Sequence, residues 1–491
     1  MAMNLDDISV GKVGFVDQHN LWNDAQKEAA ERVRAEIEEK KLRTVRVAWG
    51  DQHGIVRGKN IITHDFLHVL RNGQDFQTAT LFMDTTNNLF APMFASGGGI
   101  GMAELAGGPD SILVPDPTTF RVLPWVPHTG WVLCDMYFAN GERVPFDTRG
   151  LLATAHDALR ADGYEYVGGL EVEFYITRLE DPMLKPEQSG WPPEPPQVSV
   201  LAHGFQYLTE HRQDEIDSIL QILQENLQGV GLPLRTMEDE WGPGQCEFTF
   251  DPRIGVEAAD NMLLFRTAVK QICRREGYHA TFMTRPSLPN FFSSGWHLHQ
   301  SLRDLESGAN AFTNTSDDGS PLSEVGRHFT GGVLEHAAAA SVFTTPTING
   351  YKRFRPYSFA PDRVTWAVEN RAAFVRVIGG PGDATAHIEN RAGEPCANPY
   401  LYMLSQIVSG MDGVGRRLDP GPPDETPYES DKPLLPRSLM ESVAALGEST
   451  LFRDKLGDSF VDYMVALKQS EIGRFLAHVT DWEQREYFEV F

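Results

Sequence analysis

Two carboxylates lie two residues apart in a segment that otherwise has the composition of a buried strand. The segment is VGGLEVEFYI, residues 167–176, and the carboxylates belong to Glu171 and Glu173. Side chains alternate along a strand, so both project from the same face. Two unpaired buried carboxylates repel each other, and a divalent cation removes that conflict. A solvated strand face explains a lone Glu-x-Glu pattern equally well, so the pattern needs support from elsewhere in the chain.

Three further strand-like segments carry the same kind of ligand. They are EDEWGPGQCEFTF, SSGWHLHQSL and AHIENRAGEP, and their candidate ligands are Glu240, Glu247, His297, His299 and Glu389. Taken singly, they also fit an acidic loop and a core histidine pair. A set dominated by oxygen atoms favours Mg²⁺ or Mn²⁺ over zinc. Two such ions can bridge and neutralise a triphosphate.

Arginines follow these segments in surroundings that suggest substrate binding. Arg353 lies in NGYKRFRP, Arg371 and Arg376 lie in ENRAAFVRV, and Arg391 follows Glu389. We expect the last three in apolar, strand-like surroundings, where an unpaired charge is unfavourable. Guanidinium groups match carboxylate and phosphate oxygens in pairs. Arginines beside two cations therefore indicate phosphoryl transfer to or from a carboxylate. The chain has no Walker-type GxxxxGK[ST] motif.

The elements that must position these residues alternate irregularly between helix and strand, which predicts an α+β protein. We expect an amphipathic helix at 23–41, a hairpin turning at Asp51–Gly54, a strand at 131–138 and a helix at 148–163. A change of texture near Pro145 predicts a domain boundary between residues 142 and 143. Three loops rich in proline or polar residues are candidate lids or assembly contacts. They span residues 180–197, 304–323 and 418–438.

Composition excludes several classes of partner. The 491 residues carry a net charge of −25, which disfavours nonspecific binding to nucleic acid or to an anionic membrane. The four cysteines are scattered without a CxxC motif, as in a protein of the reducing cytoplasm. The N-terminal residues lack the pattern of a signal peptide, and no apolar stretch approaches the ~18 residues of a membrane span.

Six motifs in order give the chain a resemblance to the glutamine synthetase superfamily. They are GLEVEF, EWGPGQCE, GWHLHQSL, NGYKRFRP, ENRAAFVRV and IENRAGEPCANPYL. The resemblance runs from about residue 44 to the C-terminus. It implies an N-terminal β-grasp domain (1–142) and a catalytic domain with a curved antiparallel sheet (143–491). It also implies a homo-oligomer, a dodecamer of two hexameric rings, with active sites between neighbouring subunits.

The resemblance implies a role for each matching residue. Its substrates would be ATP, L-glutamate and an amine, with two or three Mg²⁺ or Mn²⁺ ions. One cation would be bound by Glu173, Glu240 and Glu247, and the other by Glu171, His297 and Glu389. The ATP phosphates would be contacted by His299, Ser301 and Arg376. Glutamate and the transferred phosphoryl group would be bound by Arg353, Arg371, Arg391, Ser293 and Gly295, with Glu389 taking part in catalysis.

The chain departs from the family where ammonium would bind. The family's Gly-Tyr-Glu-Ala-Pro loop reads PYSFAP here, so Phe359 replaces a glutamate. A phenyl ring neither accepts a proton nor attracts a cation by full charge. Asp84 is the remnant of an ammonium-binding segment, and Phe292 and Trp296 flank the expected glutamate contacts. These four residues predict a pocket for an organic amine, favouring an apolar or aromatic one such as aniline, whose nitrogen is neutral at pH 7.

The implied activity is ATP-dependent ligation of an amine to the γ-carboxylate of glutamate through γ-glutamyl phosphate, in amine catabolism. The likeness is greatest to γ-glutamylamide synthetases of the γ-glutamylanilide or γ-glutamylpolyamine type. Three alternatives stay open on the sequence alone: a true glutamine synthetase that uses ammonia, a γ-glutamylpolyamine synthetase, and a catalytically inactive structural relative.

Overall fold

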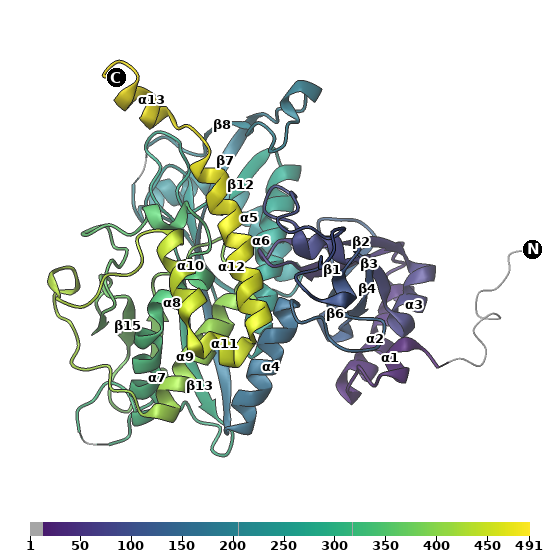
Figure 1. Ribbon diagram of the computed structural model, residues 1–491, viewed down its shortest axis with the longest axis horizontal. Coiled ribbons are helices and arrows are strands. Elements are labelled where there is room, and N and C mark those ends of the chain that lie inside the picture. The colour runs from purple at the N-terminus through teal and green to yellow at the C-terminus, as the bar shows by residue number, and fades with distance from the viewer. Residues whose placement is uncertain (1–12, 205, 317) are drawn as a thin grey trace, which may run out of the picture. The chain divides into compact units, whose positions relative to one another are not determined.

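Two β-sheets organise the chain, one in each of two separate units (Figure 1). The computed structural model describes residues 13–204, 206–316 and 318–491. The expectation about the N-terminal leader falls mostly on residues 1–12, outside the described residues. The first unit consists of three segments: the residues up to Leu81, Met93–Gly150 and Gly229–Gly231. The second unit contains Phe82–Pro92, Leu151–Gln228 and Leu232–Phe491.

The first unit is built on a six-stranded sheet with the order β2-β1-β6-β4-β3, in which β5 also pairs with β6. Strand β1 is parallel to β6, and the other pairs are antiparallel. The predicted hairpin is confirmed, because Asp51 accepts hydrogen bonds from the amides of His53 and Ile55 at the turn between β1 and β2. The strands are β1 (Thr44–Gly50), β2 (Val56–Ile62), β3 (Gln74–Gln77), β4 (Asp110–Pro115), β5 (Arg121–Val122) and β6 (Thr129–Tyr137).

The expected amphipathic helix at 23–41 is confirmed as α2 (Asp24–Glu39). Asn23 caps it by accepting from the Gln26 amide, while the Gln26 side chain accepts from the Asn23 amide. The buried residues Val33 and Ile37 lie one turn apart on its inner face. The other helices before residue 148 are α1 (Phe15–Gln18) and α3 (Thr63–Asn72).

The second unit is built on a ten-stranded sheet whose central strand, β7 (Tyr164–Asp181), pairs with five others. Its main path is β14-β15-β16-β13-β7-β10-β9, while β8, β11 and β12 also pair with β7. Only β14 and β15 are parallel among these described pairs. The strands are β8 (Gln197–Val200), β9 (Leu234–Asp239), β10 (Gln245–Phe250), β11 (Arg253–Ile254), β12 (Tyr278–Thr281), β13 (Trp296–Asp304), β14 (Trp366–Val368), β15 (Val375–Ile378) and β16 (His387–Asn390).

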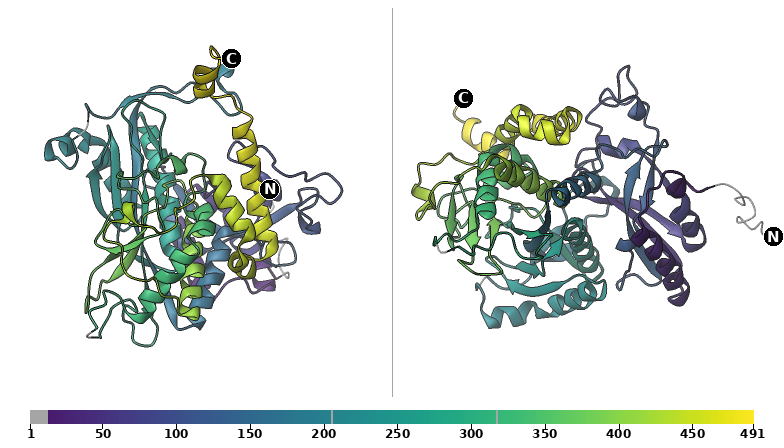
Figure 2. Two further views of the ribbon diagram at one scale, coloured as in Figure 1. Left: turned by 60° about the vertical axis from the view of Figure 1, so that its left-hand side comes forward. Right: turned by 90° about the horizontal axis from the view of Figure 1, so that it is seen from below.

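Helices pack together beside this sheet, and Figures 1 and 2 show α12 as a long helix next to α10 and α11. Helices α7 and α9 pack so closely that a Cβ on Gly332 would lie 2.1 Å from the Ser409 carbonyl oxygen. No helix in the described ranges is both long and apolar enough to cross a membrane. The helices are α4 (Thr148–Ala161), α5 (Glu210–Gly229), α6 (Val256–Arg275), α7 (Glu324–Glu335), α8 (Ala337–Thr344), α9 (Pro399–Arg416), α10 (Leu439–Glu448), α11 (Thr450–Leu456), α12 (Asp458–Leu476) and α13 (Asp481–Tyr487).

The two faces of β7 have opposite chemistry. Phe174 is fully buried, and its ring centroid lies 5.1 Å from that of Phe248, 5.6 Å from Phe265 and 4.9 Å from Phe282. The side chains of Glu171 and Glu173 alternate with it and therefore point to the other face. A slip of one residue would bury the carboxylates in this aromatic cluster, so the core fixes the register that places them. The mixed helix and strand content confirms the predicted α+β class.

Candidate active site

Cross-strand pairing brings the candidate ligands into neighbouring positions on one sheet. Glu173 lies opposite Glu247 in the pairing of β7 with β10, and Glu171 lies opposite His297 in the pairing of β7 with β13. Across the next pair of strands, His299 lies opposite Glu389. Side chains directly opposite on antiparallel strands have Cβ atoms about 4.5–5.5 Å apart. Residues as far apart in sequence as Glu171 and Glu389 therefore meet.

Two groups of potential metal ligands result. One ligand atom from each of Glu171, His297 and Glu389 lies within 4.8 Å of the others, and the same holds for Glu173, Glu240 and Glu247. We call these the histidine group and the carboxylate group. His297 Nδ1 lies 2.6 Å from a Glu171 oxygen and 3.4 Å from a Glu389 oxygen, and its Nε2 lies 3.9 Å from Glu173. The two groups thus adjoin.

The carboxylate group has more negative charge than its surroundings neutralise. Burial, reinforced by the charges of Glu171 and Glu173, raises the pKa of Glu247 to about 10. Burial and the charge of Glu173 raise the pKa of Glu240 to about 8. Glu173 accepts a hydrogen bond of 2.6 Å from the Gly295 amide. A hard divalent cation with oxygen ligands fits this donor set.

Neighbouring cationic side chains already neutralise part of the negative charge of the histidine group. Glu389 is completely buried and forms ion pairs with Arg391 and, at 3.2 Å, with Arg376. Burial raises the pKa of Glu389, but Arg391 and the nearby histidines outweigh it and lower that pKa overall. Burial likewise opposes ionisation of Glu171, yet hydrogen bonds from His297 and His299 bring its pKa well below the usual range.

The three residues expected to contact ATP lie along the edge of the histidine group. His299 Nε2 is 3.0 Å from a Glu171 oxygen, and its Nδ1 is 2.9 Å from His387 Nε2. Ser301 follows two residues later on the same face of β13, and Arg376 lies opposite Glu389 on β15. Sequence reasoning did not identify His387, which occurs in the segment DATAH just before Glu389.

The arginines differ in how their charges are held. Arg353 is buried, donates to the Arg391 carbonyl at 2.8 Å, and has Nη2 3.0 Å from His297 Nε2. Arg391 donates to the carbonyls of Arg371 at 3.0 Å and Phe359 at 3.3 Å. The prediction that Arg371 lies in apolar strand-like surroundings is wrong, because β14 ends at Val368 and Arg371 is exposed in the following turn.

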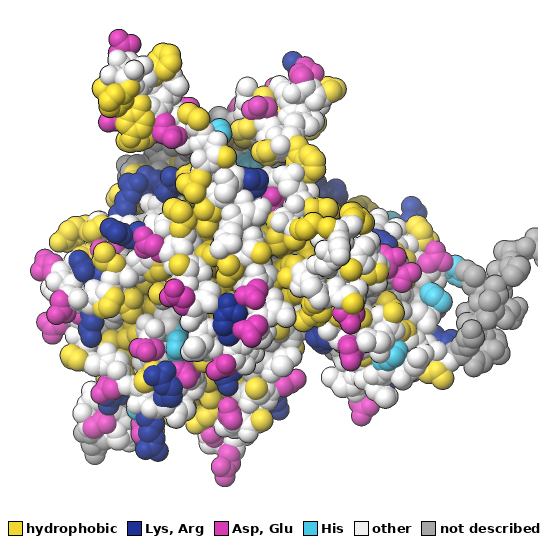
Figure 3. All heavy atoms as spheres, in the orientation of Figure 1, with side chains coloured by type: hydrophobic (Ala, Val, Ile, Leu, Met, Phe, Trp, Pro, Cys, Tyr) yellow, Lys and Arg dark blue, Asp and Glu magenta, His cyan; other side chains and the backbone are white. Residues whose placement is uncertain are grey.

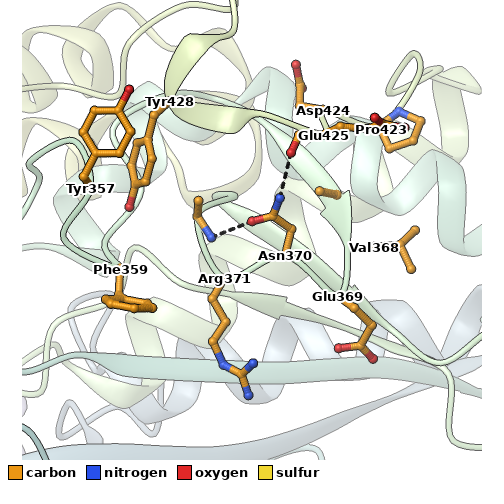
Figure 4. A pocket seen from close by; sticks show the side chains of 12 residues that line it. Tyr357, Phe359, Val368, Glu369, Asn370, Arg371, Pro423, Asp424, Glu425 and Tyr428 are labelled. Carbon is orange, nitrogen blue, oxygen red and sulfur yellow. Dashed lines mark hydrogen bonds between the residues drawn. The ribbon is translucent and has the colours of Figure 1, made fainter.

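A pocket of about 810 Å³ opens beside Arg371 (Figure 4). One end of the pocket is lined by Tyr357, Phe359 and Tyr428. At its centre, the Asn370 side chain accepts a hydrogen bond from the Ala372 amide and donates one to the Glu425 carbonyl. The Tyr428 hydroxyl donates to the Ala360 carbonyl at 2.9 Å. Together with the bond from Arg391 to the Phe359 carbonyl, this contact fastens the segment on which Phe359 lies.

Phe359 itself projects from that fastened segment. Its side chain is 73% exposed, and its backbone has a φ of 58°, as does that of Tyr357. Non-glycine residues adopt this left-handed conformation rarely, and it occurs mostly where surrounding contacts or function require it. The exposed ring and the held backbone leave an aromatic surface at the mouth of the pocket.

Two residues predicted for an amine pocket have other surroundings. Trp296 alternates with His297, so its ring lies on the opposite face of β13, fully buried 4.9 Å from the Tyr402 ring. Trp296 therefore belongs to the core. Asp84 is buried in the second unit, where it accepts from Thr86 and the Asn88 amide and pairs with Arg474 at 3.1 Å. Burial opposes its ionisation, but the bonds from Thr86 lower the pKa of Asp84 overall.

Phe292 lies in an aromatic cluster that the sequence reasoning did not identify. Its ring centroid is 6.1 Å from that of Trp241, which is 5.8 Å from that of Tyr207. Trp241 directly follows Glu240, and this adjacency to a candidate ligand is the signal that could have revealed it. Neighbouring Ser293 accepts a hydrogen bond of 3.0 Å from Arg285.

Replacing Gly295 by alanine should disturb both ligand groups at once. A Cβ there would lie 2.4 Å from Arg353 Nη2 and 3.0 Å from His297 Nε2. We expect Gly295→Ala to weaken Mn²⁺ binding by about 10- to 100-fold, as loss of a supporting contact does at metal sites. Titration calorimetry measures this affinity. Gly380→Ala is the matched control, because a Cβ there has no neighbour within 4 Å; equal affinities in both variants would contradict the assigned geometry.

Divalent cations should replace protons at Glu240 and Glu247. Both pKa values are raised from 4.5 in the folded protein, so the folded state holds more protons between pH 4.5 and about 8. The stability that these two groups contribute to the metal-free protein is fully present below pH 4.5 and falls as pH rises, up to about pH 8 for Glu240 and about pH 10 for Glu247. We expect Mg²⁺ or Mn²⁺ at 100 times its Kd to add about 2.7 kcal/mol.

Thermal unfolding between pH 5 and 9 checks this prediction, and proton release on metal binding at pH 7 is a second readout. Glu247→Gln should raise the thermal midpoint of the metal-free protein at pH 8 and remove most of the metal response. Glu306→Gln, at an exposed loop position, serves as the control. A metal-free midpoint that rose steadily with pH would refute the assignment.

Comparison with known proteins identifies the family of the chain. Residues 145–487 match the family model of the glutamine synthetase catalytic domain. A γ-glutamylanilide synthase from Acinetobacter sp is 44% identical, over 97% of this chain and 99% of its own, and a glutamate–isopropylamine ligase from Pseudomonas sp is 31% identical over 94% and 98%. The solved GmaS/ADP complex shares the fold, with a TM-score of 0.77 over 93% of this chain and 99% of its own at 23% identity. The chain belongs to the glutamine synthetase family.

Proposed function

We propose that this protein is an ATP-dependent ligase that joins the γ-carboxylate of L-glutamate to an organic amine, with an aromatic amine such as aniline as the favoured acceptor. The observation that carries the proposal is the combination of two complete metal-ligand groups with a phenylalanine, Phe359, on the segment next to the arginines. The first feature is suited to phosphoryl transfer from ATP. The second is unsuited to ammonium.

Two Mg²⁺ or Mn²⁺ ions would be bound by the histidine group and the carboxylate group. When bound, such cations neutralise phosphate oxygens and stabilise charge during phosphoryl transfer. The donor set supports this assignment because Glu240 and Glu247 hold raised pKa values without a cation beside them. A third ion has no separate ligand group among the described residues.

The remaining residues divide between structural support and substrate binding. Arg353 and Arg391 are held by backbone carbonyls and Glu389, so they give the cleft a fixed positive wall. Arg371 is exposed toward the pocket and is the arginine best placed to bind a substrate carboxylate or phosphate. His299, Ser301 and Arg376 border the histidine group on the side that we assign to the ATP phosphates.

The reaction has two steps. An oxygen of the glutamate γ-carboxylate attacks the γ-phosphorus of ATP, the bond to ADP breaks, and γ-glutamyl phosphate forms. The amine nitrogen then attacks the activated carbonyl carbon, phosphate leaves, and the nitrogen loses a proton. An alkylammonium or ammonium ion must first be deprotonated, whereas an aniline nitrogen is already neutral at pH 7. A site with Phe359 where the family has a glutamate suits the neutral amine.

The relatives support an organic acceptor over ammonia. Of the two relatives compared above, one is named for anilide synthesis and the other for isopropylamine ligation, and the anilide synthase is the more similar, at 44% against 31% identity. Glutamine synthetases are also among the similar chains, at 29–33% identity. Opening amine catabolism is the metabolic role that fits such a ligase. Cytoplasmic localisation is part of the proposal, since the four cysteines are free thiols and ATP and glutamate are cytoplasmic substrates.

We also propose assembly into a dodecamer of two hexameric rings. The C-terminal segment offers a surface for it: Thr480 and Glu483 form a capping box that starts α13. Trp482 in the first turn of the helix, and Phe488 and Phe491 after its end, are exposed, and Figure 3 shows hydrophobic side chains gathered at this end of the chain. An exposed apolar segment on a well-formed helix is typical of a contact between subunits.

Acceptor choice should depend on Phe359. Coupled measurement of ADP release with glutamate and a panel of aniline, isopropylamine, putrescine and ammonium tests the proposed activity directly. We expect kcat/KM for aniline to exceed that for ammonium by more than about 100-fold, and Phe359→Glu to lower this ratio by about tenfold or more, because a carboxylate attracts the cation. Phe359→Leu, which removes the ring without adding charge, is the control.

A wild-type preference for ammonium would instead identify a true glutamine synthetase, and a preference for putrescine would identify a polyamine ligase. No ADP release with any acceptor, together with no effect of Glu171→Ala, would favour an inactive relative.

Assembly should depend on the C-terminal helix. The double variant Trp482→Glu, Phe488→Glu places charges in the apolar segment, and we expect it to shift the particle from a dodecamer to smaller species by light scattering. Glu486→Gln, an exposed change on the same helix, should leave the mass unchanged. A double variant with unaltered mass would exclude this segment as a required contact.

A further inference from the structure

Three aromatic side chains form an exposed surface beside the carboxylate group. They are Tyr207, Trp241 and Phe292, with exposed fractions of 48%, 46% and 37%. The Trp241 ring centroid lies 5.8 Å from that of Tyr207 and 6.1 Å from that of Phe292, the latter nearly perpendicular at 81°. We call this surface the aryl platform. Large aromatic rings usually bury most of their area, so a contiguous exposed set needs an explanation.

A buried hydrogen-bond node holds the platform in place. The Tyr175 hydroxyl accepts from the Phe292 amide at 2.8 Å and from Gln245 Nε2 at 3.1 Å, and Gln245 also donates to the Trp241 carbonyl at 2.6 Å. Tyr175 and Gln245 are both buried, and the Tyr175 ring stacks on Phe291 at 4.4 Å. One node therefore fixes the backbones that carry Trp241 and Phe292, so these two rings start from preorganised backbone positions.

The platform lies close to the reacting groups that we have proposed. Trp241 directly follows Glu240 of the carboxylate group, and Phe292 lies three residues before Gly295, whose amide donates to Glu173. The charges of Glu240, Glu247 and Arg371 all act on the Tyr207 phenol, whose pKa is raised chiefly by burial. Tyr207 therefore lies within electrostatic range of the carboxylate group and of Arg371, which lines the same pocket as Phe359.

The chemistry of the platform favours a flat and uncharged ligand. Its rings supply faces and edges that suit stacked or edge-to-face contact with another aromatic ring. A ring-bearing amine held here would lie beside the carboxylate group, because Trp241 directly follows Glu240. Adenine is the other flat group in the reaction, but His299, Ser301 and Arg376, which we assign to ATP, border the histidine group on other strands of the sheet.

We infer that the aryl platform of Tyr207, Trp241 and Phe292 binds the aromatic ring of the acceptor amine and determines the preference for aromatic amines. This inference rests on the proposed ligase activity and gives it a substrate-binding surface. Trp241 takes the place that the sequence reasoning gave to Trp296. Phe292 keeps its predicted role, with Tyr207 and Trp241 as partners.

Variants of Trp241 test the inference when aniline is compared with hydroxylamine, a small amine that is also largely uncharged at pH 7 but has no ring. We expect Trp241→Leu to lower kcat/KM for aniline by about tenfold, mostly through KM, as loss of an aromatic contact with its burial would. The value for hydroxylamine and the KM values for ATP and glutamate should change less than about twofold. Trp241→Phe, which keeps a ring, should recover most of the aniline activity.

Phe292→Leu provides a second variant at another ring of the platform, because the backbone amide that donates to Tyr175 is kept in this variant. Equal losses for aniline and hydroxylamine in both leucine variants would overturn the inference, since they would indicate a structural role. A change in particle mass with unchanged kinetics would also overturn it and identify the platform as a subunit contact. If the wild-type protein forms no γ-glutamylanilide, the proposed function itself fails; if it does and the variants match it, only the platform assignment fails.

Discussion

Repulsion between carboxylates on one face of β7 is the constraint on which the rest of the site depends. Glu173 lies opposite Glu247, with Glu240 beside them, in surroundings that raise the pKa values of the last two. Like charges opposite each other destabilise a sheet. The arrangement persists because Phe174 and its aromatic neighbours on the other face fix the strand register. The apolar core thus holds together a set of charges that would separate without it.

Arginines neutralise this concentration of negative charge only at the histidine group. Arg376 and Arg391 pair with Glu389, and the pKa of Glu389 is lowered overall, so this carboxylate stays ionised without a cation. Among the described residues the carboxylate group has no arginine ion pair, and its one ion-pair contact is His297 Nε2, 3.9 Å from Glu173, so it depends more on a bound cation. The histidine group is therefore organised by the protein itself, whereas the carboxylate group is the part that we propose a cation completes.

The side of the site that we propose binds the acceptor amine consists of aromatic rings whose backbone is held by hydrogen bonds. Arg391 and Tyr428 bond the carbonyls around Phe359, while Tyr175 and Gln245 bond the backbone at Phe292 and Trp241. In both places these hydrogen bonds engage the main chain, and the rings are partly exposed.

Sequence alone was sufficient for the parts governed by local pattern. Alternation in GLEVEF identified a strand with two carboxylates on one face, and residue types in four segments indicated an oxygen-rich metal site. It also predicted the α2 helix and the β1–β2 hairpin, because capping and turn residues act over a few positions. The family followed from six ordered motifs, and Phe359 stood out as a departure within one of them.

Tertiary structure decided what depends on contacts between distant segments. Trp296 lies in the core because side chains alternate along its strand, and Arg371 is exposed because it lies in a turn. Asp84 forms an ion pair with Arg474. Tyr207, Trp241 and Phe292 lie far apart in the chain, so no local pattern could show that their rings meet. Which face a residue occupies, and which distant side chain neutralises it, is determined by register and packing over the whole sheet.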